Sequence, residues 1–155
     1  MTEKRSVLFL CTGNSARSQM AEALVNQRLG DRWAAISAGT EPATAVHPLA
    51  VEVMAELGID ISHQEPKAVS RFEADHFDLV VTLCDDAARN CPIWFSGGKV
   101  RHISFPDPAQ AVGTLEQRLQ AFRLVRDSIR EDVLNHLLQT NTLLAEENSD
   151  DTRHI

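Results

Sequence analysis

The sequence is poor in cysteine, in basic residues and in long hydrophobic runs, and each shortage excludes a class of protein. Three cysteines leave one unpaired, so they do not form a disulfide framework; catalysis, redox exchange and plain burial stay open for them. No apolar run approaches the roughly 20 residues of a membrane helix. With 15 Lys and Arg against 22 Asp and Glu, the net charge of −7 disfavours nucleic acid and anionic membranes as partners.

The first 13 residues, MTEKRSVLFLCTG, have a basic start but do not resemble an export signal. Their apolar run is about six residues long before turn residues begin, which is too short for a secretory segment. We therefore expect a cytoplasmic protein that neither enters nor binds a membrane. In that reducing compartment, thiols stay unpaired.

Short apolar stretches alternate with helical patterns, which predicts an α/β domain with a parallel sheet. Strands are expected at 6–11, 33–39, 77–83 and 99–105, and helices at 16–29, at 47–58, at the end of a connector over 59–75, and from Thr114 onward. In the last helix, the predicted buried stripe is Leu115, Leu119, Phe122, Ile129, Val133 and Leu137. We expect a small three-layer domain over 1–144 and a polar, disordered tail over 145–155.

The segment LCTGNSARSQMAEAL, residues 10–24, joins the first strand to the first helix and predicts an anion-binding loop. Small and turn-tolerant residues let backbone N–H groups curl inward at the helix N-terminus, where the helix dipole adds positive potential. Arg17 adds a planar charge that matches two oxygens of a tetrahedral oxyanion. The expected oxyanion-binding residues are Thr12, Gly13, Asn14, Ser15, Ala16 and Arg17.

Cys11 ends the first strand, at the sheet edge where parallel α/β domains bind ligands. The positive surroundings are expected to stabilise its thiolate, and the Ser18 hydroxyl is placed to donate a further hydrogen bond. Cys11 is thus predicted to be a nucleophile aimed at the bound oxyanion. The alternative is a buried structural cysteine followed by a helix cap and a surface arginine. Walker and dinucleotide loops are excluded, because their glycine and lysine patterns do not follow.

Several stretches together resemble the low-molecular-weight protein tyrosine phosphatase superfamily, from about residue 5 to residue 140. They are VLFLCTGNSARSQMAEAL at 7–24, SAG at 37–39, GIDIS at 58–62, VVTLC at 80–84 and DP at 107–108. Within this pattern, TLCDDAARNCPI at 82–93 is similar to the redox-active segment of arsenate reductases that recycle through thioredoxin. The resemblance implies a four-stranded parallel sheet in the order 2-1-3-4.

The same resemblance implies a relay in which Cys11, Cys84 and Cys91 act in turn. The strand order makes the first and third strands neighbours, about 4.8 Å apart, so Cys84 is expected within disulfide reach of Cys11. Residues 85–90 predict a short helix. The seven-residue step from Cys84 to Cys91 would rise about 10.5 Å in helical form, which exceeds the roughly 7 Å limit for a disulfide, so a Cys84–Cys91 bond requires unwinding. The alternative is two unrelated structural cysteines. A zinc site is disfavoured, because no second ligand pair accompanies them.

Asp107 lies in FPDPAQA, after the fourth strand, and the resemblance implies that it is the general acid. Thiol attack on an oxyanion expels a poor leaving group, which a placed carboxylic acid would protonate. The alternative is an Asp-Pro turn former without chemistry.

A phosphatase and an arsenate reductase of this type would share the loop, the arginine and the acid. Three differences favour the reductase. The chain has no tyrosine, and aromatic residues do not follow Asp107; two further cysteines occupy relay positions; and the loop carries Ala16 where phosphatases often have a second cysteine. A non-catalytic oxyanion or redox sensor is the alternative of another class, although such a protein needs neither nucleophile nor acid.

The expected substrate is arsenate, and the expected electron donor is thioredoxin, with glutaredoxin or glutathione as alternatives. We expect a monomer with no bound cofactor or metal. Related reductases hold potassium behind the loop with residues matching Asn14 and Ser37 and a carboxylate near position 67. Lys67 stands there in this chain, so its ammonium is expected to replace the cation and activity to be independent of potassium. The histidines share no ligand-like spacing: His47, His63, His76, His102, His136 and His154.

Overall fold

The computed structural model describes residues 4–90 and 99–153, with side chains as far as residue 140. Four parallel strands form one sheet in the order β2-β1-β3-β4, which confirms the predicted fold class and topology. The strands are β1 (Arg5–Cys11), β2 (Trp33–Gly39), β3 (Leu79–Thr82) and β4 (Lys99–His102). Because all strands are parallel, their carboxyl ends meet at one edge of the sheet.

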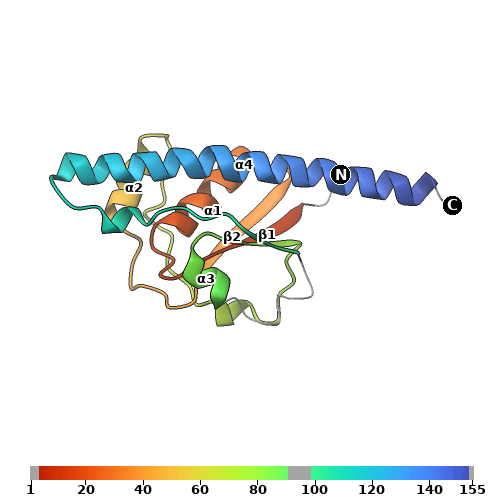
Figure 1. Cartoon of the computed structure of the whole chain (residues 1–155), viewed down its shortest axis with the longest axis horizontal. Coiled ribbons are helices and arrows are strands. Elements are labelled where there is room, and N and C mark those ends of the chain that lie inside the picture. Colours follow the sequence, from red (N-terminus) through yellow and green to blue (C-terminus); the bar gives the residue numbers. More distant parts are fainter. Residues whose placement is uncertain (1–3, 91–98, 154–155) are drawn as a thin grey trace.

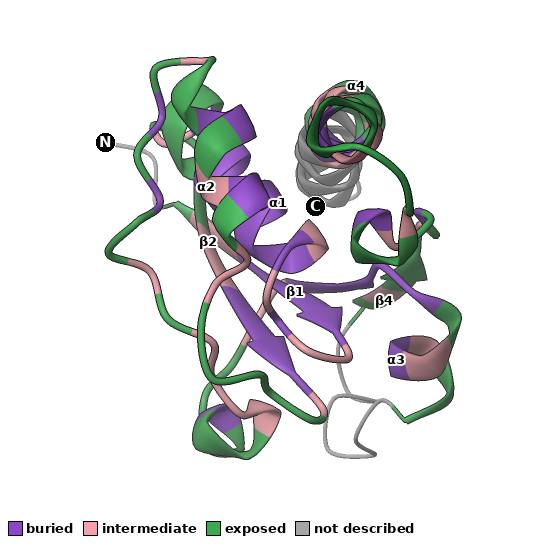
Figure 2. Cartoon of the chain, turned by 90° about the vertical axis from the view of Figure 1, so that its left-hand side faces the viewer, coloured by how far each residue is buried: buried purple, intermediate pink, exposed green. Residues whose placement is uncertain are grey.

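Helices cover both faces of the sheet, so the domain has three layers. Figure 2 shows α1 (Arg17–Arg28), α2 (Pro48–Ala55) and α4 (Leu115–Arg153) on one face. The opposite face carries α3 (Asp85–Arg89) and a single 3-10 turn, η1 (Val69–Phe72), where the sequence predicted a short helix. The second face is therefore the more thinly covered one.

The central strand β1 is buried on both sides, as expected for a parallel strand between helical layers. Val7 and Phe9 belong to the large core under α1, α2 and α4. Leu8 and Leu10 belong to a smaller core on the other face. Cys11 and Cys84 lie in this smaller core, next to Ala87 of α3 and Phe72 of η1.

The long helix α4 runs along the whole molecule and extends past the sheet (Figure 1). Five members of its predicted stripe are buried: Leu119, Phe122, Ile129, Val133 and Leu137. The expectation for Leu115 was wrong, because this residue lies in the first turn, ahead of the first core contact, and is 60% exposed. The helix continues to Arg153, through a segment that we expected to be a disordered tail; the domain boundary at 144 stays a prediction.

The predicted bounds of β2 are confirmed, whereas β3 and β4 are shorter than expected. β4 is an edge strand and ends at His102 instead of residue 105. Even so, Ile103 N–H donates to Thr82 O at 2.9 Å and Phe105 N–H donates to Leu83 O at 3.0 Å. Residues 103–105 therefore continue alongside the end of β3. None of the described helices has both the length and the apolar character needed to cross a bilayer.

Gly39 ends β2 where the strand closely approaches the loop after β1. A Cβ at this position would lie 2.6 Å from Thr12 O and 3.0 Å from Asn14 Cβ. The contact to Thr12 is with backbone, so the loop itself would have to move. Gly39 therefore sets the position of residues 12–14.

We expect Gly39→Ala to lower the affinity for inorganic phosphate by about tenfold and the free energy of unfolding by about 1–3 kcal/mol, because the substituted side chain displaces the loop. Isothermal titration calorimetry and urea unfolding measure the two effects. Gly58→Ala is the matched control, since Gly58 has a φ of 77° and nothing near its Cβ position. It is expected to lose stability and keep phosphate affinity; unchanged affinity in Gly39→Ala would contradict the assigned role.

Candidate active site

A cavity of about 320 Å³ opens at the carboxyl edge of the sheet, between the loop after β1 and the loop after β4. It brings together the nucleophile, oxyanion and acid residues predicted from distant parts of the sequence. Its lining residues are Cys11, Thr12, Gly13, Asn14, Ser15, Ala16, Arg17, Asp107 and Ala109. The size and the lining fit a small tetrahedral oxyanion, and none of these side chains is aromatic.

Asn14 gives the loop its curled shape. Its φ of 51° lies in the left-handed region, and the residue is 1% exposed. Asn14 Oδ1 accepts from Lys67 N–H at 2.9 Å and from Gln19 Nε2 at 3.0 Å, while Nδ2 donates to Ser18 Oγ at 2.7 Å. These bonds hold a conformation that turns neighbouring N–H groups toward one side, as in anion-binding nests. Donation from Ser18 to Cys11 stays a prediction, because the structure gives Ser18 as the acceptor from Asn14.

Arg17 and Asp107 face each other across the mouth of the cavity. Arg17 Nη1 donates to Phe105 O at 3.0 Å, and Nη2 lies 3.9 Å from Asp107 Oδ2. Asp107 Oδ1 accepts from Ala109 N–H at 3.0 Å and caps the 3-10 turn η3 (Pro108–Gln110). Both side chains are thus oriented before any ligand binds.

Cys84 lies directly beside Cys11, as the strand order implied. The two thiols are buried in the same small core cluster and are unbridged. Cys84 is the N-cap of α3, where its Sγ accepts from Ala87 N–H at 3.4 Å and lies 3.4 Å from Thr12 Oγ1. Cys91, the third predicted redox residue, lies outside the described residues.

The two neighbouring thiols shift each other's pKa in opposite directions. The hydrogen bond from Cys11 lowers the pKa of Cys84 to about 5, helped by Thr12, the Ala87 N–H and the charge of Arg17 against the opposing effect of burial. The same hydrogen bond, together with burial, raises the pKa of Cys11. Two adjacent thiols give up one proton readily and the second with difficulty, so the first ionisation belongs to the pair.

A charged network lies behind the loop. Lys67 Nζ is 3.6 Å from Glu22 Oε1 and donates to Glu65 O at 3.0 Å. Ser37 Oγ donates to the same Glu22 oxygen at 2.9 Å. Glu22 therefore connects the Lys67 ammonium to Ser37, and the backbone N–H of Lys67 contacts Asn14. In the part of the chain that the structure describes, His, Cys, Asp and Glu side chains form no cluster able to hold a metal ion.

Sequence reasoning missed several residues that position the site. Gln19 is fully buried and joins Asn14 to the connector, since its Nε2 donates to Glu65 O at 3.0 Å. Glu22 pairs with Lys67, and Asp86 accepts from Thr12 Oγ1 at 2.9 Å. Their partners are more than 40 residues away in the sequence, so no local pattern identifies them.

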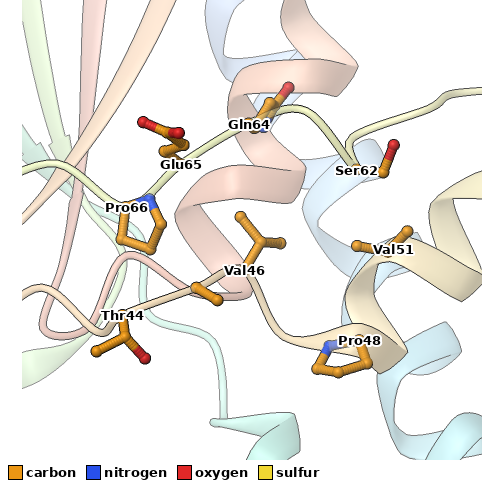
Figure 3. Close-up of a pocket in the computed structure, with 9 residues that line it drawn as sticks. Thr44, Val46, Pro48, Val51, Ser62, Gln64, Glu65 and Pro66 are labelled. Atoms are coloured by element: carbon orange, nitrogen blue, oxygen red, sulfur yellow. The ribbon is translucent and has the colours of Figure 1, made fainter.

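A second cavity, of about 700 Å³, lies between the loop before α2 and the connector at 62–66 (Figure 3). Its walls contain neither a thiol nor an arginine. They are formed by Thr44, Ala45, Val46, Pro48, Val51, Ser62, Gln64, Glu65 and Pro66. This second cavity therefore lacks the two groups that characterise the cavity at Cys11.

Comparison with known proteins agrees with this geometry. Residues 6–149 match the family model of the low molecular weight phosphotyrosine protein phosphatases. Arsenate reductase of Bacillus subtilis (strain 168) is 49% identical over 127 residues, which cover 82% of this chain and 91% of the relative.

Solved structures show the same architecture. An arsenate reductase in the phosphate binding state has a TM-score of 0.75 and 34% identity, over 87% of this chain and 98% of that one. A low molecular weight protein tyrosine phosphatase from T. tengcongensis has a TM-score of 0.73 and 26% identity, over 88% and 99% of the two chains. From its matched residues, its sheet and its oxyanion loop, the chain belongs to the low molecular weight phosphotyrosine protein phosphatase family.

Proposed function

We propose that this protein is an arsenate reductase that uses its own thiols as the source of two electrons. The observation that carries the proposal is the second thiol, Cys84, buried in the same small core cluster as Cys11, which lines the oxyanion cavity. Hydrolysis of a phosphate ester needs one thiol, whereas reduction of arsenic(V) to arsenic(III) needs two sulfurs that become oxidised together. The similarity to curated arsenate reductases supports this choice.

In the first step, Cys11 attacks arsenate held by the loop N–H groups and Arg17. A sulfur–arsenic bond forms and one arsenic–oxygen bond breaks, so the product is a covalent thiol adduct. The departing oxygen leaves as water, taking up the Cys11 proton in addition to its own. Asp107 lines the same cavity and is suited to carry that proton from sulfur to oxygen.

In the second step, the Cys84 thiolate attacks Cys11. The Cys11–Cys84 disulfide forms and the sulfur–arsenic bond breaks, with its electron pair staying on arsenic, which leaves as arsenite after protonation. A thiolate is the species that attacks in such exchanges, and the low pKa of Cys84 provides it at neutral pH.

In the third step, Cys91 attacks Cys84 and releases Cys11 for another turnover. This step requires residues 85–90 to leave their helical form, and α3 is suited to that change, since Ala87 is its one buried residue. The Cys84–Cys91 disulfide is then reduced by an external dithiol, for which thioredoxin is our first candidate and glutaredoxin with glutathione the alternative. The cycle needs a reducing compartment, so we place a monomeric enzyme in the cytoplasm.

Phosphatase activity is the second candidate, because Cys11, Arg17 and Asp107 are also what phosphate ester hydrolysis requires. The cavity lining has no aromatic wall to grip a phenyl ring, so we expect this activity to be slow. A pure oxyanion sensor would need neither the acid nor the second thiol.

Replacing either relay cysteine is expected to separate the two activities. Cys84→Ser and Cys91→Ser should abolish arsenate-dependent NADPH consumption with thioredoxin and thioredoxin reductase, because each removes a sulfur that the relay requires. Hydrolysis of p-nitrophenyl phosphate should survive in both, and Cys11→Ser should lose both activities. Rapid ester hydrolysis without arsenate turnover in the wild type would instead identify a phosphatase.

Asp107→Asn is expected to lower the rate of arsenate reduction by about 10² or more, because the leaving oxygen then departs as hydroxide, without its second proton. The amide keeps an oxygen to cap Ala109 N–H, so phosphate affinity should change little. Steady-state kinetics and phosphate titration measure the two quantities. A rate within threefold of the wild type would exclude Asp107 as the acid.

Thiolate absorbance at 240 nm should rise by one thiolate as the pH increases through about 5, because Cys84 has a lowered pKa and is ionised above it. Cys84→Ser should lose this step. Cys91→Ser should keep it and serves as the control. A first thiolate that forms only above about pH 8, the ordinary range for cysteine, would contradict the lowered pKa of Cys84.

A further inference from the structure

Helix α3 is held to the sheet by polar contacts of its first turn. Ala87 supplies its buried apolar contact, and Asp86 accepts from Thr12 Oγ1 of the oxyanion loop at 2.9 Å. Asp85 makes a second attachment, with its Oδ1 2.9 Å from His102 Nε2 on β4. The helix that carries Cys84 is thus tied to the rest of the domain at two points next to that cysteine.

His102 is itself held in place. Its Nδ1 lies 2.8 Å from Thr82 Oγ1, and Thr82 is 1% exposed at the end of β3, directly opposite His102 in the sheet register. When Nε2–H donates to the Asp85 carboxylate, Nδ1 accepts from the Thr82 hydroxyl, so one neutral tautomer satisfies both contacts. The side-chain contacts from Thr82 to His102 and from His102 to Asp85 therefore link the ends of β3 and β4 to the first turn of α3.

We propose that His102 is a positioning residue of the thiol relay, which holds α3 in its helical form through Asp85 and so keeps Cys84 against Cys11 until their disulfide has formed. This inference rests on the proposed function, because the third step of that cycle unwinds α3. We call the His102–Asp85 contact the tether. Its loss destabilises the form in which α3 is helical and both thiols are reduced, and it leaves the unwound disulfide form unaffected. The equilibrium between Cys84 and Cys91 therefore shifts toward the disulfide.

The test is a redox titration of the full chain in dithiothreitol buffers, with the Cys84–Cys91 disulfide quantified by peptide mass spectrometry. His102→Leu and Asp85→Ala are each expected to raise the equilibrium constant for the disulfide by roughly threefold, the effect of one partly exposed hydrogen bond. The double variant should show the same shift as either single variant, because both remove one interaction. Amide hydrogen exchange in residues 85–90 should quicken in all three.

His76→Leu is the matched control, since it removes another His–Asp pair, 3.8 Å to Asp78, away from α3. It should leave the titration unchanged. An unchanged constant in His102→Leu, additive shifts in the double variant, or no Cys84–Cys91 disulfide in any buffer would overturn the inference. The titration uses no arsenate, so a threefold shift without arsenate turnover would overturn the proposed function and leave the tether standing.

Discussion

The close approach of the thiols of Cys11 and Cys84 is the constraint on which the site depends. It exists because β1 and β3 are neighbours and end at the same edge, which brings residues 73 positions apart into contact. Each thiol shifts the pKa of the other, which favours loss of one proton from the pair although both sulfurs are buried. The fold therefore places the nucleophile next to its resolving thiol.

The oxyanion loop is shaped by partners remote in the sequence. Asn14 keeps its left-handed backbone through bonds from Lys67 and Gln19, and Gly39 leaves the room that the loop needs. Strain of this kind persists where surrounding contacts over-determine it, and it commonly lies at functional sites. The rigid loop contrasts with α3, which few apolar contacts hold.

Much of this arrangement could be predicted from the sequence. The bounds of β2 and the loop from Thr12 to Ala16 follow from local patterns of hydrophobic and small residues, whereas the order of the strands followed from the family resemblance. The pKa shifts of the two thiols could not be predicted, because they depend on the contact between the side chains and on the Ala87 N–H group that Cys84 meets at α3. Gln19 and His102 were missed for the same reason: each acts through a partner that only the folded chain brings near.

The central claim is that the two electrons come from the chain itself. It is tested by mixing fully reduced protein with excess arsenate in the absence of any external reductant, then measuring arsenite and mapping disulfides by peptide mass spectrometry. The account predicts one arsenite per chain and one Cys84–Cys91 disulfide, with Cys11 again reduced. Absence of arsenite, or arsenite without an internal disulfide, would contradict it.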